Sequence, residues 1–385
     1  MPKAGVTTHE RTRSPEPVTP RAFSCRCGRP IFFRNSRCLA CQRALGYDAP
    51  RRRLYAIEPV PDESGLWQES GADDGPRWRR CVNLDTASGC NWLIDASTPL
   101  DPEDAPVRGQ CIACRLTRTL PDLSVADNAT HWQRIALAQR RLVSTLVGLE
   151  LPVQSWYDDP EHGLAFDLLR ALPGVPKVTT GHANGVITID IEEADDATRE
   201  QRRQALHEPY RTLLGHLRHE SGHYYWMRLV EHGPWLEPFR ERFGDERADY
   251  AAALKAHYEQ GAPADWGTRF VSSYASAHPW EDWAETWAHY LHLVDTLDTA
   301  RSFGLHGERV ELTYERFDAR LLADAGDDTS AQGFVALLGD WMELTGVLNE
   351  LSRSMGLPDF YPFVLSYDAV RKLHFVHRVV TEKRR

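Results

Sequence analysis

The feature that most constrains this 385-residue chain is its cysteines, because all eight fall between residues 25 and 114 and form two groups of four. Closely spaced cysteines can form a tight turn that directs two thiolates at one ion, and four thiolates complete a tetrahedral zinc site. Such a closed site stabilises a fold and leaves no position for a substrate. The sequence therefore predicts two structural zinc ions, one bound by Cys25, Cys27, Cys38 and Cys41 and the other by Cys81, Cys90, Cys111 and Cys114.

The second cysteine group is the less regular one, because eight residues separate Cys81 from Cys90. Buried or reactive thiols without a metal would also explain either group, but no cysteine is left over when both groups serve as zinc ligands. The spacing leaves open an interleaved arrangement in which the two groups exchange ligands.

Three regions of the chain differ in composition. Residues 1–22 are rich in Pro, Ser, Thr and Arg and lack apolar periodicity, which predicts a disordered tail. Residues 23–118 combine all the cysteines with short strand-like runs and are expected to form a zinc-ribbon module of small β-structure. Residues 119–385 carry mostly helical patterns. We therefore predict an α+β protein in which a Cys-rich module precedes a mostly helical domain with a small sheet or hairpin.

Targeting and membrane segments are not evident in the sequence. No apolar run approaches the ~18 residues of a bilayer-spanning helix, and no hydrophobic stretch follows the basic N-terminal residues as in a secretory signal. We therefore expect a protein of the reducing cytoplasm with no membrane partner, where cysteines serve as metal ligands more often than they form disulfides. The sequence does not indicate an oligomeric state.

The charge of the chain is unevenly distributed. The formal net charge is −10, yet residues 1–55 contain 12 Lys and Arg against 3 Asp and Glu. A basic segment is compatible with binding to nucleic acid. It does not favour such binding, because four thiolates on one zinc ion add negative charge to the same region.

Hydrophobic periodicity places several elements in the second half of the chain. The strongest turn signal is Asn184-Gly185, which favours a two-residue hairpin. Residues 186–191 alternate apolar and polar side chains, as in a half-buried strand. The elements expected here are a helix over His131–Glu150, a short helix over His162–Leu172, and two hairpin strands over Lys177–Thr180 and Val186–Ile191.

One motif in the helical region carries chemistry. His219-Glu220-Ser221-Gly222-His223 is an HExxH sequence, and its two histidines lie one turn apart on the same face of a helix. Both imidazoles can reach one ion, and Glu220 between them is near enough to polarise a zinc-bound water. His216, three residues earlier on the same side, is either a competing ligand or a core histidine. A solvated helical face that happens to carry two histidines is the plainer explanation of the motif.

A catalytic zinc site usually takes three protein ligands, so a third has to come from elsewhere in the chain. Pro279 suits the first turn of a helix, and Glu281 and Glu285 then lie one turn apart on one face of it. On the opposite face we expect a core-packing set of Trp280, Trp283, Trp287 and Leu291. A surface helix would explain exposed glutamates equally well, but beside an HExxH helix the metal interpretation is favoured.

These segments together resemble the gluzincin metallopeptidases, in which HExxH precedes a distant helix with a Glu-x-x-x-acid pattern. The spacing from Tyr274 to Glu281 and Glu285 resembles the branch that includes anthrax lethal factor. From Phe23 onward the chain is also similar to a group of bacterial proteins described as putative zinc-binding metallopeptidases with an N-terminal zinc ribbon. That similarity is carried by Cys25–Cys41, His219–His223, Pro279–His292 and Leu348–Phe363.

The resemblance implies roles for particular residues. It implies that one catalytic zinc is bound by His219, His223 and Glu281, with Glu220 as the general base and Tyr274 as the donor to the oxyanion. Glu285 stands where the thermolysin-like pattern has Asp, and the implied role of this residue is to orient a ligand histidine.

The expected activity is zinc-dependent hydrolysis of a peptide or protein substrate, with the strand over residues 186–191 along the cleft that holds it. His182, just before the hairpin turn, is expected to be a turn residue rather than part of that cleft. The alternative is a regulatory protein whose zinc ribbon binds nucleic acid or protein and whose peptidase-like domain is catalytically silent.

Overall fold

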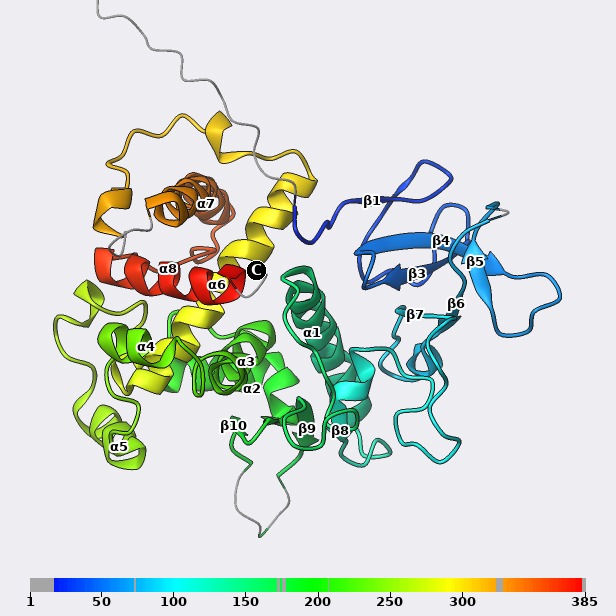
Figure 1. Cartoon of the computed structure of the whole chain (residues 1–385), viewed down its shortest axis with the longest axis horizontal. Coiled ribbons are helices and arrows are strands. Elements are labelled where there is room, and N and C mark those ends of the chain that lie inside the picture. Colours follow the sequence, from blue (N-terminus) through cyan, green and yellow to red (C-terminus); the bar gives the residue numbers. More distant parts are fainter. Residues whose placement is uncertain are drawn as a thin grey trace, which may run out of the picture.

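The computed structural model of the chain describes residues 17–72, 74–171, 174, 178–206, 208–322 and 328–382. Short strands dominate the first third of the chain and helices dominate the rest, with helix α1 (Asn128–Gly148) between the two parts (Figure 1). The predicted α+β class is therefore confirmed. Residues 1–16 of the predicted tail, and Lys177 at the start of a predicted strand, lie outside the described residues.

The cysteine-bearing part contains two antiparallel sheets. A two-stranded sheet, β1 (Phe23–Ser24) with β2 (Pro30–Ile31), lies beside the first cysteines. The larger sheet has the order β3-β4-β5-β6-β7, and each strand is antiparallel to its neighbours. Its strands are β3 (Ala44–Asp48), β4 (Arg53–Pro59), β5 (Trp67–Glu69), β6 (Trp78–Arg80) and β7 (Leu93–Asp95).

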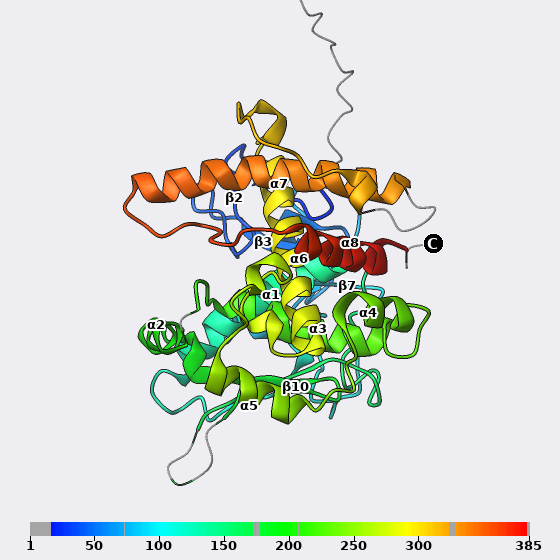
Figure 2. The same ribbon diagram turned by 90° about the vertical axis from the view of Figure 1, so that its left-hand side faces the viewer.

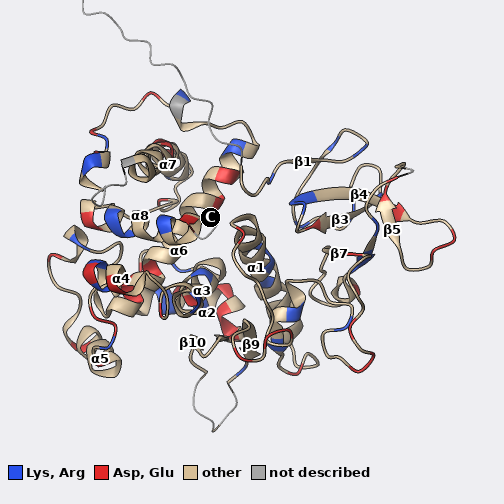
Figure 3. Ribbon diagram, viewed as in Figure 1, with Lys and Arg blue, Asp and Glu red and all other residues tan. Residues whose placement is uncertain are grey.

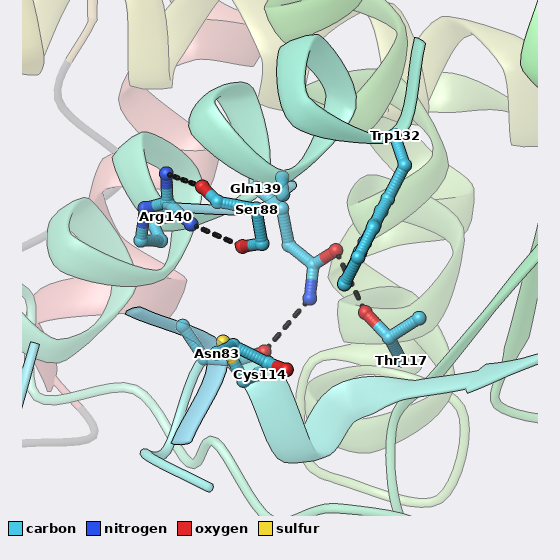
Figure 4. A pocket seen from close by; sticks show the side chains of 9 residues that line it. Asn83, Ser88, Cys114, Thr117, Trp132, Gln139 and Arg140 are labelled. Atoms are coloured by element: carbon cyan, nitrogen blue, oxygen red, sulfur yellow. Dashed lines mark hydrogen bonds between the residues drawn. The ribbon is translucent and has the colours of Figure 1, made fainter. Parts of the chain in front are cut away.

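Helix α1 attaches this part to the helical part through buried polar contacts. The Gln139 side-chain amide donates to the Ala113 carbonyl at 2.8 Å, next to Cys114 (Figure 4). The Arg140 guanidinium donates to the hydroxyl and carbonyl oxygens of Ser88 at 2.9 and 3.0 Å. Because these groups are buried with their partners, separating the two parts would leave them unpaired, which is costly.

A four-stranded sheet begins the helical part, in the order β10-β11-β9-β8. β8 (Thr117–Thr119) and β11 (Val186–Asp190) pair in parallel with β9 (Ala165–Leu169). β10 (Gly181–Ala183) is antiparallel to β11 across the predicted Asn184-Gly185 turn and forms one edge of the sheet. The edge formed by β10 lies against helix α3 (Leu213–Leu229), which carries the HExxH sequence.

Two secondary-structure predictions in this region are wrong. Within the described residues 162–171 the predicted short helix is absent, and strand β9 occupies the centre of this segment because parallel neighbours on both sides bury it. The first hairpin strand lies at residues 181–183 rather than 177–180. The helix predicted over residues 131–150 is confirmed as α1, and the predicted module boundary after residue 118 falls inside β8.

Helix α6 (Pro279–Ser302) is buried along most of its length and lies against α3 and α8 (Tyr367–Glu382). Figure 2 shows α7 (Asp328–Ser354) running across one end of the molecule. The other helices are α2 (Asp196–Ala205), α4 (Leu236–Phe243) and α5 (Tyr250–Gln260). Within the described residues, none of these helices combines the length and apolar character needed to cross a bilayer.

The described start of the chain, residues 17–22, forms an N-terminal strap along α6. The backbone N–H groups of Val18 and Thr19 donate to the Asp298 carboxylate at 3.1 and 2.8 Å. The Arg21 guanidinium lies 2.9 Å from the Asp295 carboxylate and also donates to the Ser144 hydroxyl of α1 at 2.8 Å. The prediction of a disordered tail is therefore wrong for residues 17–22.

Asp295 is the centre of a buried charge cluster. Besides Arg21, it contacts Arg141 of α1 and Arg218 of α3, each with a nitrogen to oxygen distance of 2.6 Å. Burial opposes ionisation of Asp295, but the three guanidinium groups outweigh it and lower the pKa of the carboxyl. The charged Asp295 thus joins the strap, α1 and α3 to α6.

Candidate metal centre

The two cysteine groups assemble in the order in which they occur in the sequence. All eight thiols are free of disulfides, and within each group the four sulfurs lie within 4.8 Å of one another. The Sγ–Sγ distances include 3.6 Å for Cys25–Cys41, 3.8 Å for Cys27–Cys38 and 3.6 Å for Cys90–Cys111. Four sulfurs bound to one zinc at about 2.3 Å would be about 3.8 Å apart, so both groups fit zinc and are not interleaved.

Helix α3 presents the HExxH residues in the helical part. It begins after Thr212, whose hydroxyl accepts the N–H of Gly215 at 3.0 Å and so satisfies one free donor of the first turn. His219 and His223 then lie one turn apart, with ring centroids separated by 5.1 Å. Both rings face α6.

Gly222 allows α3 and α6 to approach closely. A Cβ atom at this position would lie 2.9 Å from the Cα of Ala284 and 3.3 Å from its carbonyl oxygen. The Trp283 indole N–H donates to the Gly222 carbonyl at 2.8 Å across the same contact. The glycine inside the HExxH sequence therefore sets the distance between the two helices.

Gly222→Ala is expected to lower the free energy of unfolding by about 1–3 kcal/mol, because the added methyl group would meet backbone that cannot rotate away. The measurement is equilibrium urea unfolding of the full chain. Gly333→Ala in α7 is the matched control, since its Cβ would meet nothing within 4 Å. The control should raise stability by roughly 0.5–1 kcal/mol through helix propensity. Equal stability of the two variants would contradict close packing at Gly222.

The first turn of α6 is fixed from several sides. Pro279 occupies its first turn, and the His278 ring accepts the N–H of Trp280 at 3.1 Å. Asp282 lies 2.6 Å from the ammonium of Lys372 on α8, and both side chains are buried. Burial raises the pKa of Asp282 to about 7 against the opposing effect of Lys372.

The tryptophans of α6 differ in how far they are buried. Trp283 and Trp287 are fully buried as predicted. Trp280 is partly buried and packs against the core as predicted, but its ring centroid also lies 4.6 Å from that of His223. It therefore lies beside the metal-binding candidates as well as against the core.

His219, His223 and Glu281 converge on one point. Glu281 Oε2 lies 3.0 Å from His219 Nε2 and 3.7 Å from His223 Nε2. One donor atom from each of the three residues lies within 4.8 Å of the others. Burial opposes the charge on Glu281, but the two imidazoles outweigh it and hold its pKa well below the usual range.

This donor set fits zinc. Glu281 Oε2 and His223 Nδ1 are buried, and within the described residues neither has a hydrogen-bond partner. A buried carboxylate oxygen that faces two imidazole nitrogens is costly unless a cation compensates it. Two nitrogens and one carboxylate oxygen form a common protein ligand set for catalytic zinc, with one position left open.

Glu285 orients His219 from the side opposite Glu281. Its Oε1 lies 2.7 Å from His219 Nδ1, and the Ser272 hydroxyl donates to Oε2 at 2.6 Å. Because a carboxylate only accepts, His219 carries a proton on Nδ1, which leaves Nε2 free for a metal. Burial raises the pKa of Glu285, but the contact with His219 dominates and lowers it to about 2.

Glu220 lies on α3 between the two histidines and is only 8% exposed. Burial raises the pKa of its carboxyl. Within the described residues no hydrogen bond holds this carboxylate, so its oxygens are free to accept a proton. A poorly solvated, unpaired carboxylate beside a metal site suits a general base.

Three further residues were candidates from the sequence, namely Tyr274, His182 and His216. They lie at different distances from the proposed metal ligands. The Tyr274 ring centroid is 6.0 Å from that of His219, and burial raises the pKa of its hydroxyl. His182 on β10 accepts the Gly185 N–H at 3.1 Å, as the predicted turn residue would, and its ring also lies 6.2 Å from that of His223. His216 instead places Nδ1 3.5 Å from Glu193 Oε2, so the structure pairs it with that carboxylate.

Tyr250 is a residue of this site that no sequence feature indicates. Its hydroxyl donates to Glu281 Oε1 at 2.6 Å, although it lies 31 residues before Glu281. No motif spacing connects the two positions, and Tyr250 begins α5, a helix without other candidate residues. Only the folded structure could reveal this contact.

Both parts of the chain are similar to known protein families. Residues 128–379 match the family described as "Putative zinc-binding metallo-peptidase", and residues 22–125 match the family described as "zinc-ribbon domain". Uncharacterized proteins of Mycobacterium bovis (strain ATCC BAA-935 / AF2122/97) and Mycobacterium tuberculosis (strains CDC 1551 / Oshkosh and ATCC 25618 / H37Rv) are each 42% identical to this chain. The similarity extends over 364 residues, which is 94% of this chain and 96% of each relative. No solved structure matches the chain.

Proposed function

The chain belongs to the putative zinc-binding metallo-peptidase family, and from this premise we propose that it hydrolyses peptide bonds at His219, His223 and Glu281. The observation that carries the proposal is the convergence of Glu281 Oε2 on the two histidine Nε2 atoms, at 3.0 and 3.7 Å. Three protein ligands and an open fourth position are the ordinary arrangement of a catalytic zinc site.

Zinc in such a site supplies Lewis acidity, which makes water a stronger nucleophile near neutral pH and polarises a substrate carbonyl. Glu220 accepts a proton from the attacking water through its unpaired, poorly solvated carboxylate. It then returns that proton to the leaving amine of the cleaved peptide. Glu285 keeps the His219 proton on Nδ1 throughout, so the ligand nitrogen does not change.

Tyr274 is the proposed donor to the developing oxyanion. Burial raises the pKa of its phenol, so it remains protonated and able to donate. Its ring lies beside His219, on the side of the centre reached from the loop that precedes α6. A donor aimed at the developing charge stabilises the transition state more than the ground state.

The edge strand β10 supports a peptide as the substrate. It pairs only with β11 in the four-stranded sheet and lies against α3. An extended peptide can add to such an edge through main-chain hydrogen bonds. His182 on this strand places its ring near His223, so a peptide bound there would pass the proposed metal.

The direct test is incubation of the full chain with a peptide library of mixed sequence, followed by mass spectrometry of the new termini. We expect cleavage that a chelator abolishes and that added zinc restores. Cleavage of the same bonds by the Glu281→Ala variant would show that the activity does not come from this site.

We expect about three zinc ions per chain, two in the cysteine sites and one at the HExxH site, with different responses to two substitutions. Glu281→Ala should remove only the third ion, because it deletes a ligand. Glu285→Ala should weaken that ion by about 10–100-fold without abolishing it, since Glu285 contacts a ligand and not the metal. Elemental analysis against graded chelator measures both. If Glu285→Ala lost the third ion while Glu281→Ala bound it normally, Glu285 would be the metal ligand and Glu281 the residue that orients a ligand histidine.

A second candidate function is nucleic-acid binding by the first cysteine module. Lys and Arg positions recur on the loops around β1 and β3 (Figure 3). Within the described residues, four exposed arginines form no ion pair with Asp or Glu, namely Arg26, Arg29, Arg34 and Arg37, whereas Arg43 interacts with the Cys41 thiol. Salt-dependent binding of a labelled single-stranded oligonucleotide, without cleavage of any peptide, would favour this function.

A further inference from the structure

The proposed metal ligand Glu281 has two carboxylate oxygens in different surroundings. Oε2 faces the ring nitrogens of His219 and His223. Oε1 accepts a hydrogen bond of 2.6 Å from the Tyr250 hydroxyl. A carboxylate free to rotate would exchange its two oxygens, whereas a donor fixed on one of them selects the other for the metal.

The direction of the Tyr250 hydroxyl is set by the ring that carries it. The ring meets His278 edge-on at 5.2 Å between centroids and Trp280 at 6.0 Å, both beside the first turn of α6. Tyr250 also opens α5 directly after Asp249, whose carboxylate caps the helix by accepting the Ala252 N–H at 3.0 Å. The donor is therefore held by its ring and by its helix.

We propose that Tyr250 is a positioning residue for the metal: its hydroxyl holds Glu281 Oε1 and so presents Oε2 to the ion together with His219 and His223. This inference rests on the proposed function, because it requires that the three residues bind zinc. The role differs from that of Tyr274, for which the structure gives no hydrogen bond to a ligand within the described residues. Tyr250 acts through Glu281 and does not need to contact the substrate.

Helix α5, which carries Tyr250, has no buried residue of its own. Little apolar packing therefore holds it to the rest of the molecule. Besides the Tyr250 hydrogen bond, its contacts with the site include the His257 ring, 5.9 Å from that of Tyr274. The Tyr250 hydrogen bond to Glu281 is therefore one of the few contacts that join this exposed helix to the proposed metal site.

The test compares the full-length chain with Tyr250→Phe, and uses Tyr258→Phe on the same helix as the matched control. Tyr250 is 38% exposed and Tyr258 is 63% exposed, so neither substitution removes a core side chain. Each protein is loaded with zinc and equilibrated with graded chelator, and the metal retained is measured by elemental analysis. The ion missing from Glu281→Ala identifies the site. We expect Tyr250→Phe to lose this ion at about 10–100-fold lower chelator strength, and Tyr258→Phe to behave as wild type.

The possible results distinguish a failure of the Tyr250 inference from a failure of the proposed function on which it rests. If the wild-type chain holds the third ion and Tyr250→Phe binds it equally well, Tyr250 does not position Glu281 and the inference is overturned. If the wild-type chain never holds a third ion, the proposed function fails as well. A Tyr250→Phe chain that also loses the cysteine-bound ions or melts earlier without metal would show a general structural defect, which overturns the positioning role.

Discussion

Glu220→Gln is expected to lower peptide hydrolysis by at least about 10²-fold while the chain keeps its fold and its zinc. Glutamine retains the shape of the side chain but cannot accept the proton from water. Because Glu220 faces the site without a hydrogen-bond partner in the described part of the chain, its replacement removes no structural contact. The measurement is the initial rate on a peptide first shown to be cleaved by the wild type.

The control for this variant is Glu241→Gln on the exposed surface of α4, which should leave the rate unchanged. Elemental analysis of both proteins establishes that their zinc content is equal. Near-normal turnover by a zinc-loaded Glu220→Gln chain would exclude Glu220 as the base, and with it the mechanism proposed for this site.

Asp295→Asn is expected to lower the free energy of unfolding by about 3–5 kcal/mol, the usual cost of breaking a buried ion pair from one side. The substitution keeps the volume of the side chain and removes its charge, which leaves Arg21 and Arg218 as buried cations without a carboxylate. Arg141, which is partly exposed, loses the same partner. Urea unfolding of the zinc-loaded full chain measures the loss.

Asp245→Asn provides the matched control, because Asp245 pairs with Arg247 on the surface, where both side chains are more than half exposed. An exposed pair of this kind contributes about 0–1 kcal/mol. Similar unfolding midpoints for the two variants would show that the cluster around Asp295 does not stabilise the fold.

The cysteine groups and the HExxH sequence could be predicted because their chemistry is local. Except for Cys81 and Cys90, the ligands occur in pairs two to four residues apart, so spacing alone brings the atoms of each pair together. The prediction of Glu281 depends on weaker signals, namely helical periodicity and a family resemblance. The structure brings this residue to the two histidines. Its role as a ligand stays a prediction that the zinc measurements above address.

The features that sequence analysis missed depend on contacts between distant segments. Strand β9 was predicted as part of a helix because a short apolar run has no diagnostic period when both of its faces are buried. Its parallel partners, β8 and β11, are not adjacent to it along the chain, and α1 lies between β8 and β9. The contact of Tyr250 with Glu281 likewise joins two helices, and the strap joins residues separated by most of the chain.

The N-terminal strap has a consequence for the order in which the molecule is completed. Its residues are synthesised before their acceptors on α6, which follow 274 to 281 residues later. At roughly 5–20 residues per second, translation alone separates these events by about 15–55 s. During that time the nascent cysteine module can fill its zinc sites, while Arg21 still lacks its carboxylate. Closing of the strap thus cannot precede synthesis of the helix that carries Glu281.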